Sequence, residues 1–389
     1  MKSLSLISTL AAAATASPLL TRQLEARAIV KPGFTAIFLD QFTGTAGSLP
    51  SSSNWIIDQG TQYPGGAPQW GNNELETYTA STSNLQITKS GTLYIIPQKN
   101  TTGWTSGRIE TQRSDFACAM GKKMLVEASI KLGAAPVAEQ QGIWPAFWAL
   151  GSSFRGNYTN WPAATEWDFL EAVNGASTIY STAHCGTAPG GPCNEYNGLG
   201  DGGIAFTRSV FHTVTFQIDR SMTGPGTKGT WKNETLMWFL DGKSVFSITG
   251  AQVGDQNTWA ALAHDAHFLL LNVAVGGSWP GNPNSQTIGG VTVGMEVDYG
   301  TLEYETFCTP GQCCFASKSD AEGNPQPVVV AVGSLNLADA NVLLKNTSTV
   351  SIWDAWDCSG SAIKTFNAFN GDANLGTPTI VGGFTFFTN

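Results

Sequence analysis

Charged residues are scarce in this chain. It holds 20 Lys and Arg and 29 Asp and Glu among 389 residues, so charged residues make up 13% of it, against about 25% in an average globular protein. The formal net charge is −9. Because proteins that bind nucleic acid gain affinity by neutralising phosphates with basic residues, this composition argues against a nucleic-acid partner.

Long apolar runs and long amphipathic helical patterns are also missing. After the N-terminus no run approaches the roughly 18 apolar residues of a membrane span. Residues 384–389 are too few and too polar to form a lipid-anchor signal. We therefore expect no membrane partner, and a fold built from strands rather than helices.

The N-terminus predicts secretion. Residues 1–16 read as a signal peptide, with Lys2 as the positive start, a short apolar run and a small-residue cleavage site. Residues 17–30 follow as a pro-segment or a disordered tail. We expect an extracellular glycoprotein, with N-glycosylation acceptor sequences at Asn100, Asn157, Asn233 and Asn346.

Short runs rich in Val, Ile, Thr and aromatic residues recur between Gly, Asn, Asp and Pro clusters, which is typical of strands. The predicted strands cover residues 85–88, 92–97, 123–132, 146–150, 166–173, 178–184, 212–219, 235–240, 243–248, 268–275 and 295–304. Asp241 and Gly242 form a strong hairpin signal between two of them. We therefore predict an all-β fold, a two-sheet β-sandwich of the jelly-roll type.

The character of the sequence changes after residue 307, where two adjacent cysteines and the polar residues 317–327 follow. We place one β domain over residues 31–309 and a small, disulfide-stapled, β-rich region over residues 310–389. Cys185 and Cys193 flank a Gly/Pro-rich loop and form the easiest local disulfide to propose. The connectivity of the later cysteines stays open, and with seven cysteines at least one lies outside any internal pair. The remaining five are Cys118, Cys308, Cys313, Cys314 and Cys358.

Three carboxylates lie within six residues of one predicted strand, Glu166, Asp168 and Glu171. Side chains alternate along a regular strand, so Glu166 and Asp168 share a face and Glu171 falls on the other. One extra residue in a β-bulge returns Glu171 to the first face. Two such acids suit the retaining cleavage of glycosidic bonds; an exposed acidic strand or a calcium site is the plainer alternative.

Eight segments between residues 38 and 304 resemble glycoside hydrolase family 16, the secreted β-glucanase family that includes laminarinases and lichenases. They occur in the order expected for that family. The segments are 70–78 (WGNNELETY), 106–111 (SGRIET), 142–151 (GIWPAFWALG), 166–171 (EWDFLE), 211–213 (FHT), 238–242 (WFLDG), 271–277 (LNVAVGG) and 297–299 (VDY).

The resemblance implies a jelly roll with a concave cleft and a retaining double displacement. Glu166 corresponds to the nucleophile, Asp168 to the supporting carboxylate and Glu171 to the acid/base. Negative charge on Asp168 is expected to keep a proton on Glu171. No cofactor is implied, although the family often holds a structural calcium ion and Asp298 occupies the matching strand.

The two residues before Glu171, Phe169 and Leu170, match the bulged form of the laminarinase-like branch, which agarases and carrageenases share. The resemblance thus predicts a monomeric endo-β-glucanase acting on β-1,3- or mixed β-1,3/1,4-glucans, with a β-glucan polysaccharide as its partner. Two alternatives remain. One is a cell-wall glucan transglycosylase. The other is a non-catalytic glucan-binding protein, against which the presence of both Glu166 and Glu171 argues.

Substrate-binding roles are carried over from the resemblance for eight residues, each with a structural alternative. Core packing competes for the tryptophans, a salt bridge for Arg108, a turn for Asn73 and a structural role for His184. The cysteine-flanked loop after His184 is longer than the family pattern. The eight residues are Asn73, Arg108, Trp144, Trp148, Trp161, His184, Asn272 and Trp279.

Overall fold

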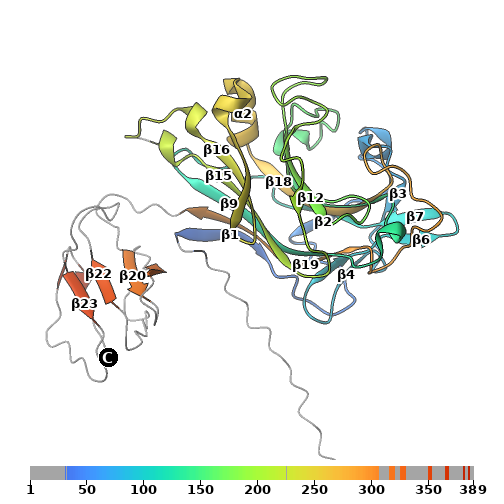
Figure 1. Ribbon diagram of the computed structural model, residues 1–389, viewed down its shortest axis with the longest axis horizontal. Coiled ribbons are helices and arrows are strands. Elements are labelled where there is room, and N and C mark those ends of the chain that lie inside the picture. Colours follow the sequence, from blue (N-terminus) through green and yellow to red (C-terminus); the bar gives the residue numbers. More distant parts are fainter. Residues whose placement is uncertain are drawn as a thin grey trace, which may run out of the picture.

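The computed structural model describes residues 31, 33–224 and 226–305, with side chains as far as residue 300, and six short strands beyond them. Two eight-stranded sheets lie face to face around one hydrophobic core (Figure 1). The predicted all-β two-sheet sandwich is confirmed. No helix of the described part is long and apolar enough to cross a membrane.

The first sheet, sheet A, runs in the order β17, β16, β15, β9, β19, β5, β4, with β1 pairing β19 from the side. All of its pairings are antiparallel. Its strands are β17 (Lys243–Thr249), β16 (Thr235–Leu240), β15 (His212–Asp219), β9 (Lys123–Leu132), β19 (Met295–Glu305), β5 (Leu93–Ile95), β4 (Leu85–Ile87) and β1 (Phe34–Asp40).

The second sheet, sheet B, runs in the order β13, β12, β11, β10, β18, β8, β2, and β14 pairs β12. Its strands are β13 (Leu199–Gly200), β12 (Thr178–His184), β11 (Glu166–Glu171), β10 (Ile143–Gly151), β18 (His267–Val275), β8 (Arg108–Thr111), β2 (Trp55–Ile57) and β14 (Ile204–Ala205). The outer face of sheet B, away from the core, carries the three predicted acids.

Smaller elements complete the described chain. A three-stranded sheet joins β3 (Glu76–Tyr78), β7 (Gly103–Ser106) and β6 (Gln98–Asn100), with β3 and β7 parallel. The helices are α1 (Gly250–Val253) and α2 (Gln256–Ala263), with 3-10 turns at Pro68–Gly71, Val137–Glu139, Ser152–Phe154, Ser221–Thr223 and Trp231–Asn233. Beyond residue 305, β20 (Phe315–Ser319) pairs β21 (Pro325–Val329), β22 (Thr349–Ile352) pairs β23 (Lys364–Asn367), and β24 (Ile380–Val381) pairs β25 (Phe384–Thr385).

Most predicted strands are present, and β9, β12, β15 and β16 match their predicted ranges to the residue. The predicted hairpin at Asp241 and Gly242 is confirmed, since both residues have positive φ, 50° and 76°, as a type I′ turn requires. The disulfide between Cys185 and Cys193 is confirmed as well, with a Cα–Cα distance of 5.4 Å.

Other predictions are not tested. The signal peptide, the pro-segment or tail and the later cysteines lie outside the described residues. The proposed boundary near residue 310 stays a prediction. Cys118 is buried in the core between the sheets.

Strand β11 is fixed from both sides of the core. The Trp167 indole donates a hydrogen bond to the carbonyl of Leu262 in α2, at 2.8 Å. The Trp238 indole, from sheet A, donates to the carbonyl of Asp168, also at 2.8 Å. Both tryptophans are buried, so neither bond competes with water, and together they hold the backbone that carries the acids.

Helix α2 is in turn tied to sheet A through Glu234, which is 1% exposed. Its carboxylate accepts hydrogen bonds from Trp259 (2.7 Å) and Arg220 (3.0 Å), and pairs with His264 at 2.5 Å. Burial alone would raise the pKa of Glu234, but these hydrogen bonds and one from Thr223 outweigh it and lower the pKa to about 2.

Replacing Glu234 by Gln should therefore lower the free energy of unfolding at pH 7 by about 3–5 kcal/mol, because the buried Arg220 loses its counter-charge. The ionised Glu234 stabilises the fold above the pKa of an unfolded Glu, and this contribution is lost as pH falls toward 2. Urea unfolding at several pH values should thus show the two proteins converging in acid.

The matched control is Asp115→Asn. It breaks the exposed pair with Arg113, whose side chains are 69% and 42% exposed, and should cost at most about 1 kcal/mol. Equal, small losses for both variants would contradict the assigned role of Glu234.

Candidate active site

The three acids do lie on one face of β11, and a bulge places them there. Strand β11 advances from Asp168 to Glu171 while β12 advances only from Thr182 to Tyr180. The pairing with β10 shifts at the same point. Phe169 and Leu170 both fill the bulge and are 1% and 0% exposed, in the core. The extra residue therefore returns Glu171 to the outer face, as predicted.

The neighbouring strands set the surroundings of each acid. Glu166 lies opposite His184 on β12 and Leu150 on β10. Asp168 lies opposite Trp148, and Glu171 opposite Tyr180. On the β12 side the acids thus face polar or aromatic residues, whereas on the β10 side only Asp168 faces an aromatic ring, that of Trp148.

Glu166 and Asp168 act as a coupled pair of carboxyl groups. Asp168 is 2% exposed, and burial together with the negative charges of Glu166 and Glu171 raises its pKa well above the usual range. Burial also raises the pKa of Glu166, whereas the charge of His184 and a hydrogen bond with Asp168 lower it. The proton shared by this pair therefore resides on Asp168, and Glu166 is the group that ionises first.

Glu171 is a half-buried acid that retains its proton near neutrality. Burial, followed by the negative charge of Glu166, raises the pKa of Glu171 to about 7. The Trp144 indole donates a hydrogen bond to its Oε1 at 2.9 Å, which opposes part of that rise. Burial and the charge of Glu166 favour the expected proton on Glu171. The pKa of Asp168 is itself raised well above its usual range, so Asp168 is not the main source of that charge.

The aromatic residues of this face remain accessible. Trp144, Trp148 and Trp161 are half-buried, whereas Trp55, Trp167, Trp238 and Trp259 belong to the core. The Trp161 indole donates to Glu166 Oε2 at 3.2 Å. Trp279 is 46% exposed and meets the Trp144 ring edge to face at 5.6 Å. Flat, partly exposed rings beside the acids are suited to stacking on sugar rings.

Arg108 and Asn272 are buried residues that hold the Trp148 ring in place. Arg108 is 4% exposed and forms a salt bridge from Nε to Asp58, at 2.9 Å. The structure therefore favours the salt-bridge role of Arg108 over direct substrate binding. Its guanidinium lies 4.8 Å from the centre of the Trp148 ring. Asn272, also 4% exposed, accepts a hydrogen bond from the Trp148 indole at 2.8 Å. Both residues position Trp148 rather than present themselves to solvent.

Asn73 has the turn role that was its structural alternative, and its substrate-binding role stays a prediction. It is exposed and has a φ of 62°, which fits the turn, and its amide donates to Ser278 Oγ at 2.8 Å. It therefore joins the segment before β3 to the segment that carries Trp279.

Sequence reasoning missed two residues of this site. Tyr180 lies opposite Glu171 and contacts Trp279 at 5.1 Å between ring centres. Glu195, which is 5% exposed, contacts His184. The alternation of β12, which places Tyr180 on the face of His184, could have indicated the first. Nothing local marks the second, which stands in the long loop after Cys185.

A metal site was the alternative for these acids. Oxygen or nitrogen atoms of Glu166, Asp168 and His184 lie within 4.8 Å of one another. The pKa values of Asp168 and His184 are both raised, and His184 Nε2 lies 3.5 Å from Asp168 Oδ2. We interpret the group as a proton-sharing cluster. Asp298, the residue considered for calcium, lies in sheet A, where the pairing of β19 with β9 shifts.

No family model matches the chain. Among solved structures, it is similar to an endo-1,3-β-glucanase from Streptomyces sioyaensis, with 41% identity, 71% of this chain and 99% of that one covered, and a TM-score of 0.66. Among curated proteins, it is 28% identical to glucan endo-1,3-β-glucosidase A1 of Niallia circulans over 69% of this chain, and 27% identical to the clotting factor G alpha subunit of Tachypleus tridentatus over 64%. The chain spans only 37% and 31% of the lengths of these two relatives.

The two contributions to the pKa of Glu171 can be separated by substitution. Glu166→Gln removes the nearby negative charge and should lower the pKa of Glu171 below 7. Trp144→Phe removes the donated hydrogen bond and should raise it. Carboxyl ¹³C NMR of Glu-labelled protein measures both. Shifts in the same direction for the two variants would show that the assigned causes are wrong.

Proposed function

Because the chain belongs to glycoside hydrolase family 16, we propose that it hydrolyses internal bonds of β-1,3- or mixed β-1,3/1,4-glucans with retention of configuration. The observation that carries the proposal is the placement of Glu166 and Glu171 on one face of β11, with different protonation. Retaining enzymes need one ionised and one protonated carboxyl group on either side of the scissile bond.

In the first step, the Glu166 carboxylate attacks the anomeric carbon while Glu171 gives its proton to the glycosidic oxygen. The bond to the leaving chain breaks as a glycosyl ester forms. In the second step, ionised Glu171 takes a proton from water, the water oxygen attacks the same carbon, and Glu166 leaves as a carboxylate.

The cluster supports this division of roles. Glu171, with a pKa of about 7, is protonated in mild acid. The hydrogen bond from Asp168 favours the ionised form of Glu166, which the attack requires. The rate should therefore be highest between the pKa of Glu166, which is raised from 4.5, and about pH 7.

Secretion and independence from metals are further parts of the proposal. The disulfide is compatible with an oxidising compartment, and the acceptor residues Asn100, Asn157 and Asn233 are exposed. We propose a monomer that needs no cofactor for hydrolysis, with calcium near Asp298 as a structural ion at most. Activity that survives EDTA supports hydrolysis without a cofactor. An unchanged melting temperature in EDTA would count against a structural calcium ion.

The roles of the two acids can be distinguished by azide. With an activated aryl β-glucoside, Glu166→Ala should give the inverted α-glycosyl azide, because azide replaces the missing nucleophile. Glu171→Ala should give the retained β-azide, because azide attacks the glycosyl ester formed on Glu166. Asp115→Ala, at an exposed site, is the control and should behave like wild type. Exchanged stereochemistry between the two variants would reverse the role assignment.

The substrate is tested with a panel of laminarin, lichenan, xyloglucan and agarose. Since the similar solved structure and one curated relative are named for endo-1,3-β-glucan cleavage, we expect the fastest release of reducing ends from laminarin. Activity on agarose alone would contradict the proposal. Products longer than a single supplied laminari-oligosaccharide would indicate the transglycosylase, and binding without cleavage the glucan-binding protein.

A further inference from the structure

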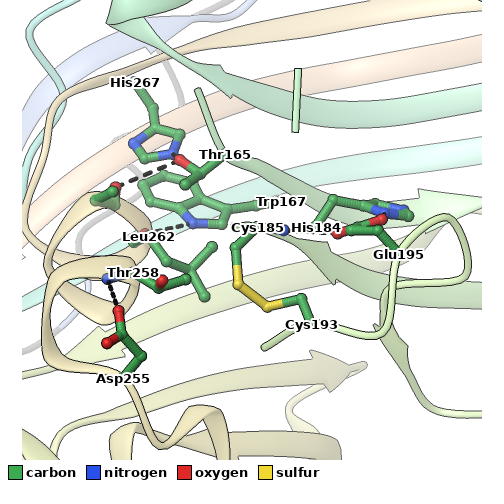
Figure 2. The surroundings of a disulfide bond; sticks show 11 residues. Thr165, Trp167, His184, Cys185, Cys193, Glu195, Asp255, Thr258, Leu262 and His267 are labelled. Carbon is green, nitrogen blue, oxygen red and sulfur yellow. Dashed lines mark hydrogen bonds and ion pairs between the residues drawn. A yellow bond between two sulfur atoms is a disulfide. The ribbon is translucent and has the colours of Figure 1, made fainter. Parts of the chain in front are cut away.

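The loop between β12 and β13 places a buried carboxylate behind His184. Figure 2 shows Glu195 next to His184, close to the disulfide between Cys185 and Cys193. Glu195 as a whole residue is 5% exposed, but its side chain is fully buried, and both carboxylate oxygens have hydrogen-bond partners. Oε1 accepts a hydrogen bond from the Cys185 backbone N–H at 2.7 Å, and Oε2 lies 2.8 Å from His184 Nδ1.

The loop backbone holds this carboxylate in place. Glu195 exchanges two backbone hydrogen bonds of 2.5 Å with Gly190, within the loop that the disulfide closes. Further on, Gly198 has a φ of +70°, and a Cβ built there would lie 2.9 Å from His184 Nδ1. The loop therefore encloses the histidine ring closely, and only glycine fits at this point.

His184 links this loop to the acids. Its Nε2 lies 3.5 Å from Asp168 Oδ2, and Glu166 is its cross-strand neighbour. The Trp161 ring, whose indole binds Glu166, lies 5.4 Å from the imidazole. The titratable groups around His184 are thus Glu195 on the loop and Glu166, Asp168 and Glu171 on β11.

We propose that Glu195 is a positioning residue, which holds a proton on Nδ1 of His184 and so directs Nε2 of the same ring at the Asp168 and Glu166 pair. An ionised carboxylate only accepts hydrogen bonds, so Nδ1 must be the donor. Nε2 is then the atom that gains or loses a proton beside Asp168.

The consequence for catalysis rests on the proposed function. Burial opposes the charge on His184, but the hydrogen bond from Nδ1 to Glu195 and the negative charge of Glu166 raise its pKa overall. The resulting imidazolium is the strongest influence that lowers the pKa of Glu166, exceeding the opposite effect of the Glu195 charge. Glu195 thereby keeps the nucleophile ionised at lower pH.

Glu195→Gln is the decisive substitution. If its amide oxygen keeps the bond from Cys185, its NH₂ group faces Nδ1 and requires that nitrogen to be unprotonated. His184 should then be the neutral Nε2–H tautomer at pH 6, whereas in wild type it should carry both protons. ¹⁵N NMR of the histidine-labelled full-length chain distinguishes these states.

The pH profile of hydrolysis gives a second readout. In Glu195→Gln the acidic limb of kcat/KM should move up by about one pH unit, the effect of losing a nearby positive charge on a carboxyl. At pH values below the limb, kcat/KM should therefore fall by up to about tenfold, the largest effect of a one-unit shift in a single ionisation. A residue that only stabilised the fold would lower activity without moving the limb.

Asp241→Asn is a matched control. Asp241 binds His212 Nδ1 at 2.7 Å and the backbone N–H of the following residue, Thr213, at 2.9 Å, which repeats the arrangement at Glu195. It lies in the hairpin between β16 and β17 of sheet A. Its substitution should leave both the titration of His184 and the pH profile of hydrolysis unchanged.

The outcomes separate this proposal from the proposed function. A wild-type His184 without a proton on Nδ1 overturns the role of Glu195, whether or not any variant folds. A folded Glu195→Gln protein with an unchanged His184 titration and an unchanged acidic limb overturns it as well. If wild type does not hydrolyse laminarin, the proposed function fails, and the NMR titration still decides between Glu195 as the proton-holding partner and a loop that only encloses the ring.

Discussion

The bulge in β11 is the constraint on which the candidate site depends. Two consecutive side chains, Phe169 and Leu170, both enter the core, so the strand gains one residue without a cross-strand partner. The free energy for this irregularity comes from burying two large apolar side chains where a regular strand would bury one. Glu171 is thereby brought to the face of Glu166, and the hydrogen bond from Trp238 to the Asp168 carbonyl closes the gap from the core side.

Burial then assigns the protons among the acids. A carboxylate in a desolvated position is costly unless it is paired. The three acids of β11 share a single histidine, His184, which also contacts the carboxylate of Glu195 in the loop. The most buried acid, Asp168, therefore stays protonated, and the two half-buried acids divide the remaining roles. Different protonation of neighbouring carboxyl groups thus follows from differences in burial together with the charge of His184, which lowers the pKa of Glu166.

Part of the fold and of the candidate site could be predicted from the sequence. The period of two along residues 166–168 and its break before Glu171 are local signals, and so are the turn residues Asp241 and Gly242. A salt bridge was among the roles weighed for Arg108. That Arg108 and Asn272 support Trp148 could not be predicted, since their partners Asp58 and Tyr78 are distant in the sequence.

Short elements were also difficult to predict. Helix α2 has eight residues, and its N-cap, Asp255, looks like any turn residue without its bond from Thr258. Glu195 carries no motif, and its contact with His184 depends on how the disulfide between Cys185 and Cys193 closes the loop. Local patterns therefore indicate the acids, whereas the residues that set their protonation become visible only in three dimensions.

The central claim is that the bulge places Glu166 and Glu171 on the same face of β11, where we propose that they act as nucleophile and acid/base of a double displacement. The most direct measurement is ¹H NMR of the anomeric proton during the first minutes of laminari-oligosaccharide hydrolysis. The account predicts that the β-anomer of the new reducing end appears first and converts slowly to the α-anomer. Initial release of the α-anomer would contradict it, because inversion places a water where Glu166 is assigned to attack.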